Sequence, residues 1–177
     1  MSSNRVLAAV ALALVAVLGV YWFLIRQDTA DPHVVVPKLT ATIGEGSEAV
    51  GVAAGGSVVR WLPLPEEPPL PRLSLDEVPK GGHVRGPALE QVRVLAATPK
   101  ELQPYVASSY FGESGVEIEL TTGIEIRFGE AVQARRKWRA AAAVLADPSI
   151  TALDYVNVES PDRPTHEGSE HELPPPP

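Results

Sequence analysis

The chain has 177 residues, a net charge of −7 and no cysteine. This length allows one compact domain of ordinary size together with one membrane segment. A chain without cysteine has no disulfide, no thiolate metal ligand and no cysteine nucleophile, and the acidic balance argues against a nucleic-acid-binding protein.

The first feature along the chain is an uncharged stretch, residues 6–25, composed mostly of Ala, Val and Leu. At about 1.5 Å per residue, about twenty residues cross a hydrocarbon core of about 30 Å. We therefore expect a cytoplasmic N-terminus at residues 1–5 and a transmembrane helix at 6–25, with Arg5 favouring the N-terminus-inside orientation. A cleavable signal peptide is the alternative, but Asp28-Thr-Ala30 is a poor cleavage site.

The next part of the chain alternates in the manner of short strands. Residues 26–48 are predicted to be a juxtamembrane connector, within which Leu39–Ile43 has strand periodicity. Two further strands are expected at Ala49–Val52 and Ser57–Leu62. The proline-rich segment Pro63–Pro71 is predicted to be an exposed loop because proline cannot donate to a sheet.

A helix is expected to begin at Pro87, a residue suited to the first helical position. Leu89, Val92 and Leu95 then recur at helical spacing until Pro99 ends the pattern. The segment that follows, from Tyr105 to Phe111, is predicted to be a strand.

The clearest pattern is a hairpin. Val116–Leu120 and Ile124–Phe128 both alternate apolar and charged residues, which is the period of a strand with one wet face. Gly123 can supply a positive φ at the short turn between them, so the two strands are expected to be antiparallel neighbours.

Helical periodicity returns at Glu130–Ala146, where Trp138 lies on the apolar face and is expected to pack against the sheet. The basic residues of this segment could attract an acidic partner or lipid head groups, but a solvated helix face is the simpler interpretation; they are Arg135, Arg136, Lys137 and Arg139. A last strand is expected at Leu153–Val158, before Pro161 and Pro164.

Together these elements predict an α+β fold class, with an N-terminal transmembrane helix followed by a mainly antiparallel β-sheet domain and two packing helices. The β domain is assigned to residues 49–164. Residues 165–177 are polar and end in four prolines, so they are predicted to be a disordered tail.

The ordered pattern from Gly123 to Pro164 resembles the C-terminal β domain of the FtsQ/DivIB family of cell-division proteins. It is carried by Phe128-Gly129, Lys137-Trp138, Val144-Leu145, Tyr155-Val-Asn-Val158, Pro161, Arg163 and Pro164. The family's membrane-proximal POTRA domain has little counterpart here, since only Leu39–Glu45 resembles its last strand.

The resemblance implies a non-enzymatic divisome scaffold that binds an FtsB/FtsL-like complex by β-strand addition during septum formation. The implied partner-binding residues are Tyr155, Val156, Asn157, Val158, Glu159 and Ser160. The implied location is the cytoplasmic (inner) membrane at the division septum, single-pass, with the C-terminal domain extracytoplasmic.

Other chemistries find less support in the sequence. Glu117 and Glu119 fall on the wet face of a strand, with nothing to raise a carboxyl pKa for catalysis, and His166 and His171 lie in the predicted tail without a fixed spacing. We expect no catalytic residue, cofactor or metal site. The alternative function is a membrane-anchored extracytoplasmic ligand-sensing or substrate-binding module, with a small molecule in the groove between sheet and helix.

Overall fold

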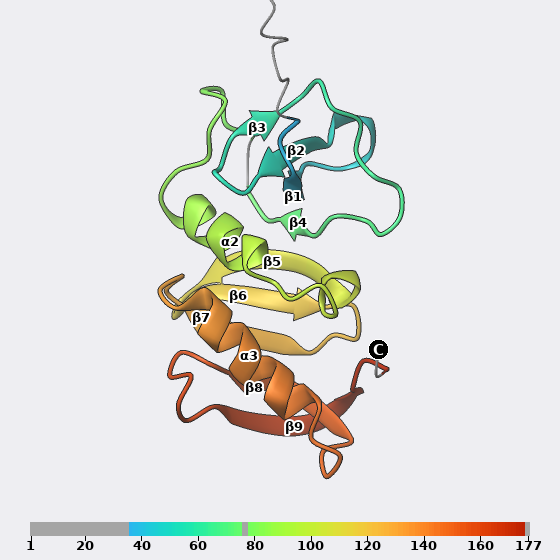
Figure 1. Ribbon diagram of the computed structural model, residues 1–177, viewed down its shortest axis with the longest axis vertical. Helices are drawn as coiled ribbons and strands as arrows, with labels where there is room; N and C mark the ends of the chain where they lie inside the picture. The colour runs from blue at the N-terminus through green and yellow to red at the C-terminus, as the bar shows by residue number, and fades with distance from the viewer. Residues whose placement is uncertain (1–35, 76–77, 176–177) are drawn as a thin grey trace, which may run out of the picture. The chain divides into compact units, whose positions relative to one another are not determined.

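The computed structural model describes residues 36–75 and 78–175. Residues 37–177 form one compact unit, which holds a nine-stranded sheet in the order β3-β2-β1-β4-β5-β6-β7-β8-β9 (Figure 1). The strands are β1 (Leu39–Ile43), β2 (Val50–Ala53), β3 (Val58–Val59), β4 (Arg72–Leu73), β5 (Val106–Gly112), β6 (Gly115–Leu120), β7 (Glu125–Gly129), β8 (Ala152–Asn157) and β9 (Thr165–Glu172). The helices are α2 (Pro87–Ala96) and α3 (Ala134–Leu145), with 3₁₀ turns at Gly46–Glu48 and Gln103–Tyr105.

The sheet is mixed, and its parallel pairs are explained largely by helical connections. α2 joins β4 to β5 and α3 joins β7 to β8, and both pairs are parallel, as a helical crossover requires. β1 and β4 are also parallel, whereas the remaining neighbours are antiparallel. The predicted mainly antiparallel sheet is therefore corrected to a mixed one.

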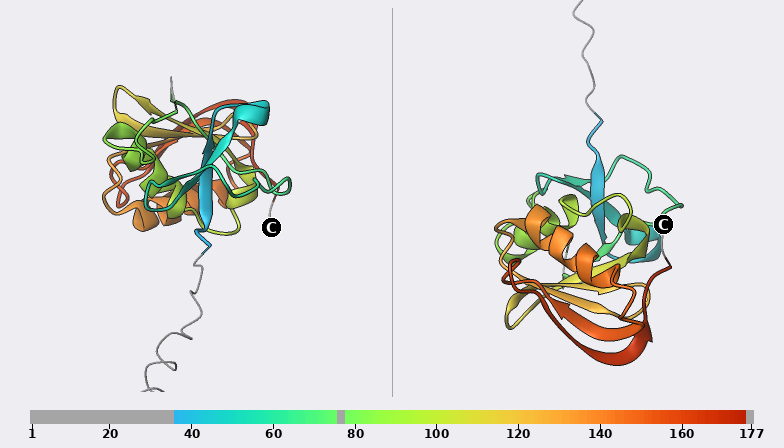
Figure 2. Two further views of the ribbon diagram at one scale, coloured as in Figure 1. Left: turned by 90° about the horizontal axis from the view of Figure 1, so that it is seen from above. Right: turned by 60° about the horizontal axis from the view of Figure 1, so that its bottom comes forward.

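Both helices lie on the same face of the sheet, as two views show (Figures 1 and 2). The core lies between this face and the helices. Trp138 of α3 is fully buried, donates from Nε1 to the Val94 carbonyl at 2.9 Å and meets the Phe128 ring at 4.8 Å between centroids. The prediction that Trp138 packs rather than recognises a partner is confirmed.

The predicted membrane topology is contradicted. A bilayer-crossing helix needs about 20 residues, whereas the longer described helix, α3, has 12. Within residues 36–75 and 78–175, no helix is both long and apolar enough to cross a membrane. The fold class and the single-pass inner-membrane location are corrected in this respect; residues 6–25, on which both rested, lie outside the described residues.

Several predicted elements are confirmed by the structure. The strand at Leu39–Ile43 has the expected bounds, and the helix begins at Pro87 as expected and ends at Ala96, before Pro99. The β6–β7 hairpin is antiparallel, and Gly123 has the expected positive φ, 92°.

Two predicted elements are shorter than expected. Of the strand expected at Ser57–Leu62, only Val58–Val59 forms a strand, β3. The second helix begins at Ala134 rather than Glu130 because Gln133 takes a left-handed conformation, φ 59° and ψ 27°, which a continuous α-helix cannot include.

The C-terminal segment departs most from the sequence prediction. Thr165–Glu172, predicted to be disordered, forms β9 and pairs antiparallel with β8. Its side chains are almost all exposed. The strand therefore buries little apolar surface, and buried apolar surface was the criterion on which the prediction of disorder rested. Backbone hydrogen bonds and side chains of β8 hold the strand instead.

Candidate functional site

The two edges of the sheet differ in what covers them. At the β3 edge, the Val58 N–H donates to Gly82 O and the Val84 N–H donates to Gly56 O, both at 2.8 Å, so this edge is occupied by the chain itself. At the other edge β9 is the terminal strand, and nothing in the described part of the chain pairs with its outer side. An unpaired edge is a template for another strand.

The direction of the β9 backbone groups follows from the pairing of β8. The Val158 N–H donates to Arg127 O at 2.9 Å, so alternation turns Tyr155 and Asn157 toward β9. These two residues are paired with Glu167 and Thr165, whose N–H and C=O groups therefore face β8. His166 lies between them, so its N–H and C=O lie in the plane of the sheet and point away from β8, toward the open edge.

A bulge interrupts β9 beyond this straight segment. Four residue steps of β9, from Glu167 to His171, lie opposite two steps of β8, from Leu153 to Tyr155. Asp154 Oδ1 accepts the N–H groups of Ser169 and Glu170 at 3.1 and 2.7 Å, so these donors are satisfied within the chain. The edge that can pair with a partner is thus mainly Thr165–Glu167.

Gly168 is required in this bulge for two reasons. Its φ is +97°, and an added Cβ would lie 2.0 Å from Cγ of Asp154. A side chain at this position would therefore be strained and would displace the carboxylate that holds the bulge.

The face of the sheet away from the helices is lined by polar side chains in two cross-strand rows. One row runs through Tyr110, Glu117, Arg127, Asn157 and Thr165, and the other through Ser108, Glu119, Glu125, Tyr155 and Glu167. Residues opposite one another in register point to the same face. We call these ten residues the polar face.

A chain of contacts crosses the polar face as far as β9. Tyr110 OH donates to Glu125, and the Arg127 guanidinium donates to the same carboxylate. The guanidinium carbon lies 3.9 Å from the centroid of the Tyr155 ring, and Tyr155 OH donates to Glu167 Oε2 at 2.8 Å. These contacts hold a fixed surface that ends at the open edge.

The ionisation of this network follows from its contacts. Burial opposes ionisation of Glu125, but hydrogen bonds from Tyr110 and Arg127 outweigh it and lower the pKa of this carboxyl. Burial, then hydrogen bonds to Glu125 and Glu117, raise the pKa of Tyr110 far above its ordinary range. At neutral pH Glu125 is a carboxylate and Tyr110 is a neutral donor.

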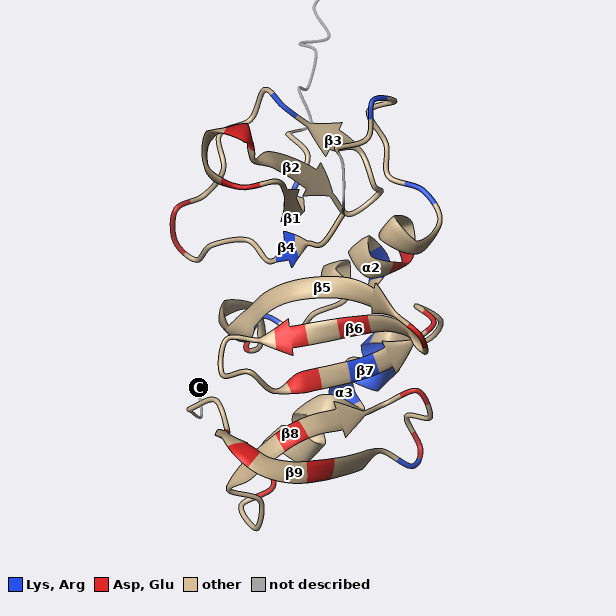
Figure 3. Cartoon of the chain, turned by 180° about the vertical axis from the view of Figure 1, so that it is seen from behind, with Lys and Arg blue, Asp and Glu red and all other residues tan. Residues whose placement is uncertain are grey.

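The polar face carries more negative than positive charge. Among its ten residues are four carboxylates and one guanidinium, and Arg127 is already bonded to Glu125. Figure 3 marks acidic residues in red on β6, β7, β8 and β9 and a basic residue in blue on β7. Basic side chains on a bound segment would strengthen its contact with this face.

The predicted partner-binding residues are divided by the structure. Tyr155, Val156 and Asn157 lie in β8, which is paired on both sides, so their backbone groups are not free for strand addition. Val156 and Val158 are core residues. The side chains of Tyr155 and Asn157 belong to the polar face, whereas Glu159 and Ser160 are exposed beyond the strand. The open edge lies one strand further along the chain than predicted.

The edge strand β9 and Asp154, which holds its bulge, were not predicted from the sequence. The prolines at 161 and 164 were predicted to end the sheet. In the structure this segment contains a turn in which the Arg163 N–H donates to Ser160 O at 3.0 Å. A turn followed by eight residues without proline is the available sequence signal for a hairpin.

The basic residues of α3 also differ from one another. Arg135, Arg136 and Arg139 are exposed as expected, but Lys137 is buried. Its Nζ donates to Phe128 O at 2.7 Å and to Glu130 O at 2.8 Å, and burial lowers its pKa. Lys137 thus binds carbonyls at the end of β7.

The described residues contain no group of three or more His, Asp or Glu side chains placed to hold a metal ion. Comparison with protein-family models and with curated protein sequences finds no match to this chain.

Proposed function

We propose that this protein is a binding module that captures a partner segment by adding it to β9. The observation that carries the proposal is the open edge at Thr165–Glu167. There the His166 N–H and C=O pair with no other described residue, while β8 pairs with the neighbours of His166. Backbone pairing of this kind supplies affinity without catalytic side chains.

The family resemblance supports a specific setting for this binding. The pattern from Gly123 to Pro164 is similar to FtsQ/DivIB proteins, whose last β-domain strands receive an FtsB strand. We propose a non-enzymatic divisome scaffold that binds an FtsB/FtsL-like complex.

The structure also supports a chemical preference for the partner. The straight edge is short, because the bulge held by Asp154 ends it. Additional affinity would have to come from side chains over the polar face, where Glu119 and Glu167 are exposed and neither forms a salt bridge with another residue that the structure describes. A partner strand that carries Lys or Arg on the side facing the polar face would pair with the short edge and also form ion pairs with these glutamates.

The test is a binding titration of the full chain against the FtsB-like segment of the same organism, with two variants of one residue. His166→Pro removes the outward N–H, and His166→Ala removes the same side chain but keeps that N–H. We expect micromolar or tighter binding by the wild type and by His166→Ala, and at least tenfold weaker binding by His166→Pro. Thermal melting of each variant checks that the fold is retained.

Equal binding by the two variants would reject strand addition at β9, and no binding by a folded wild-type chain would reject the divisome partner. Val156→Pro is unsuitable as a probe, because alternation turns the Val156 N–H toward β7 inside the sheet.

A further inference from the structure

A surface apart from the polar face lies at the C-terminal end of α3. It is a groove of about 670 Å³ between three segments: the loop and 3₁₀ turn before β5, the end of α3 with the loop after it, and the chain that follows β9. Volumes of about 300–1,000 Å³ are typical of sites for small organic ligands.

The groove offers an apolar lining. Leu102, Leu145, Ile150 and Leu173 all line it, and each is partly buried against the core. Removal of this partly exposed apolar surface from water by a ligand is favourable.

The C-terminal chain closes one side of the groove. Leu173, Pro174 and Pro175 line it, and Tyr105 OH donates to Pro175 O at 3.1 Å. Tyr105 belongs to the 3₁₀ turn on the opposite wall, so this hydrogen bond joins two walls and defines the cavity between them.

The charged residues of the lining have one sign. Glu101, Asp147 and Glu172 line the groove, and none of the described lining residues is Lys, Arg or His. The Asp147 carboxylate accepts the Ser149 N–H at 2.9 Å and the Ser149 hydroxyl at 2.7 Å, and these bonds lower its pKa. An apolar lining that carries acidic side chains and no basic ones is complementary to an aliphatic cation.

We propose that this groove binds an amphiphilic small molecule with an aliphatic body and an ammonium group. The aliphatic body contacts the leucine and isoleucine side chains, and the ammonium group lies near Glu101 and Glu172. The alternative function considered from the sequence placed a small molecule in a groove between sheet and helix. The present proposal adds the chemical class of that ligand. It stands independently of strand addition at β9.

The test compares three probes with the same ten-carbon chain: decylammonium, decanol and decanoate. Each is titrated by calorimetry into the full chain at pH 8, below the critical micelle concentration of the probe. We expect decylammonium to bind most tightly and decanoate least tightly. Methyl NMR signals of Leu145, Ile150 and Leu173 should shift on binding.

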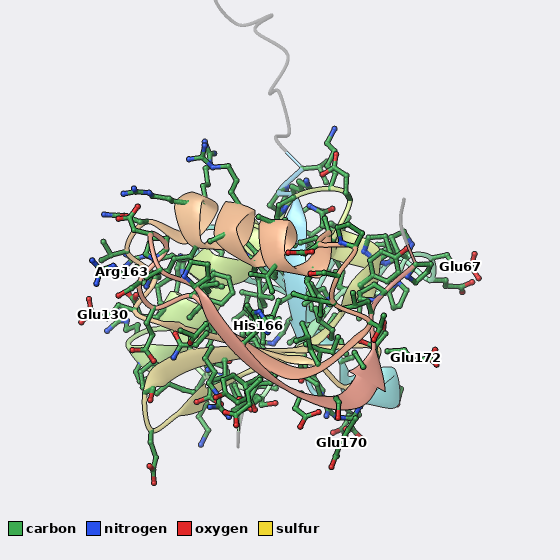
Figure 4. The ribbon with its side chains drawn as sticks, turned by 90° about the horizontal axis from the view of Figure 1, so that it is seen from below. Glu67, Glu130, Arg163, His166, Glu170 and Glu172 are labelled. Carbon is green, nitrogen blue, oxygen red and sulfur yellow. The ribbon has the colours of Figure 1, made fainter. Side chains whose placement is uncertain are left out.

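Two paired variants separate charge from burial. Glu101→Gln combined with Glu172→Gln should weaken decylammonium binding roughly fivefold and leave decanol binding unchanged. The control is Glu113→Gln with Glu130→Gln, which changes the net charge equally at exposed positions outside the groove. Figure 4 shows Glu130 on the opposite side of the molecule from Glu172.

A third variant fills the cavity. Ala146 is exposed and lines the groove, so Ala146→Trp should abolish binding of all three probes while the chain stays folded. Equal binding of the three probes, no binding of any, or an equal effect of both Gln pairs would overturn the proposal. The wild-type NMR shifts decide the location even if Ala146→Trp fails to fold.

Discussion

Asp154 in β8 fixes the backbone of Glu170 in β9, whose N–H donates to the Asp154 carboxylate at 2.7 Å. Asp154→Ala removes this acceptor and that of Ser169, so we expect a loss of about 1–2 kcal/mol in the free energy of unfolding. Urea denaturation measures the loss, and amide hydrogen exchange locates it. Asp154→Asn, which keeps one oxygen acceptor, should lose less; unchanged protection of both amides in Asp154→Ala would contradict the assignment.

Tyr110 should make the fold sensitive to alkaline pH. Because burial and its hydrogen bonds to Glu125 and Glu117 raise its pKa, the folded state keeps a proton that the unfolded chain releases above about pH 10. This contribution is fully present below pH 10 and declines as the pH rises further. Tyr110→Phe should flatten the decline in melting temperature between about pH 9 and 11; identical slopes would refute the role of Tyr110.

Glu125 should act at the acidic end. Burial opposes its charge, but hydrogen bonds from Tyr110 and Arg127 lower its pKa, so its contribution is present above the unfolded value of about 4.3 and is lost as the pH falls through the lower folded value. The stability difference between wild type and Glu125→Gln should therefore be largest near pH 7 and shrink below about pH 4. Chemical denaturation across this range measures it, and a difference independent of pH would count against the network.

Trp138 provides a test of the core. Trp138→Phe removes the indole N–H that donates to the Val94 carbonyl at 2.9 Å, while this carbonyl keeps the Ala97 N–H at 3.1 Å, so we expect the lost hydrogen bond to cost about 0.5–1.5 kcal/mol. Trp138→Ala also leaves a cavity and should cost about 3–5 kcal/mol. Urea denaturation of both variants checks the order, with Trp61→Phe as an exposed control. A Trp138→Phe variant as stable as wild type would show that the hydrogen bond contributes little.

Periodicity was sufficient where each strand or helix buries one face. Val116, Ile118 and Leu120 are all buried, and their alternation with glutamates marks both the strand and its wet face. The same holds for α2, where Pro87 fixes the start. These local patterns reflect burial directly, which is why they predict structure.

The candidate site could not be predicted in the same way. Thr165–Glu172 is exposed along most of its length, so no apolar alternation marks it as a strand. Its order depends on β8 and Asp154, which are contacts between strands. Lys137 is a similar case, since only the tertiary structure brings the carbonyls of Phe128 and Glu130 within reach of its side chain. The polar face likewise depends on the register of five strands.

The bulge of β9 has a consequence for the protein when the proposed partner segment is not bound. Identical chains can pair through the backbone groups of an unpaired edge strand, and long, straight edge strands are the ones that start fibrils. Here Asp154 occupies the N–H groups of Ser169 and Glu170, and the strand carries three glutamates. Copies that meet at β9 encounter an interrupted backbone ladder and like charges. The edge that we propose for binding a short foreign strand is therefore unfavourable for growth into an aggregate.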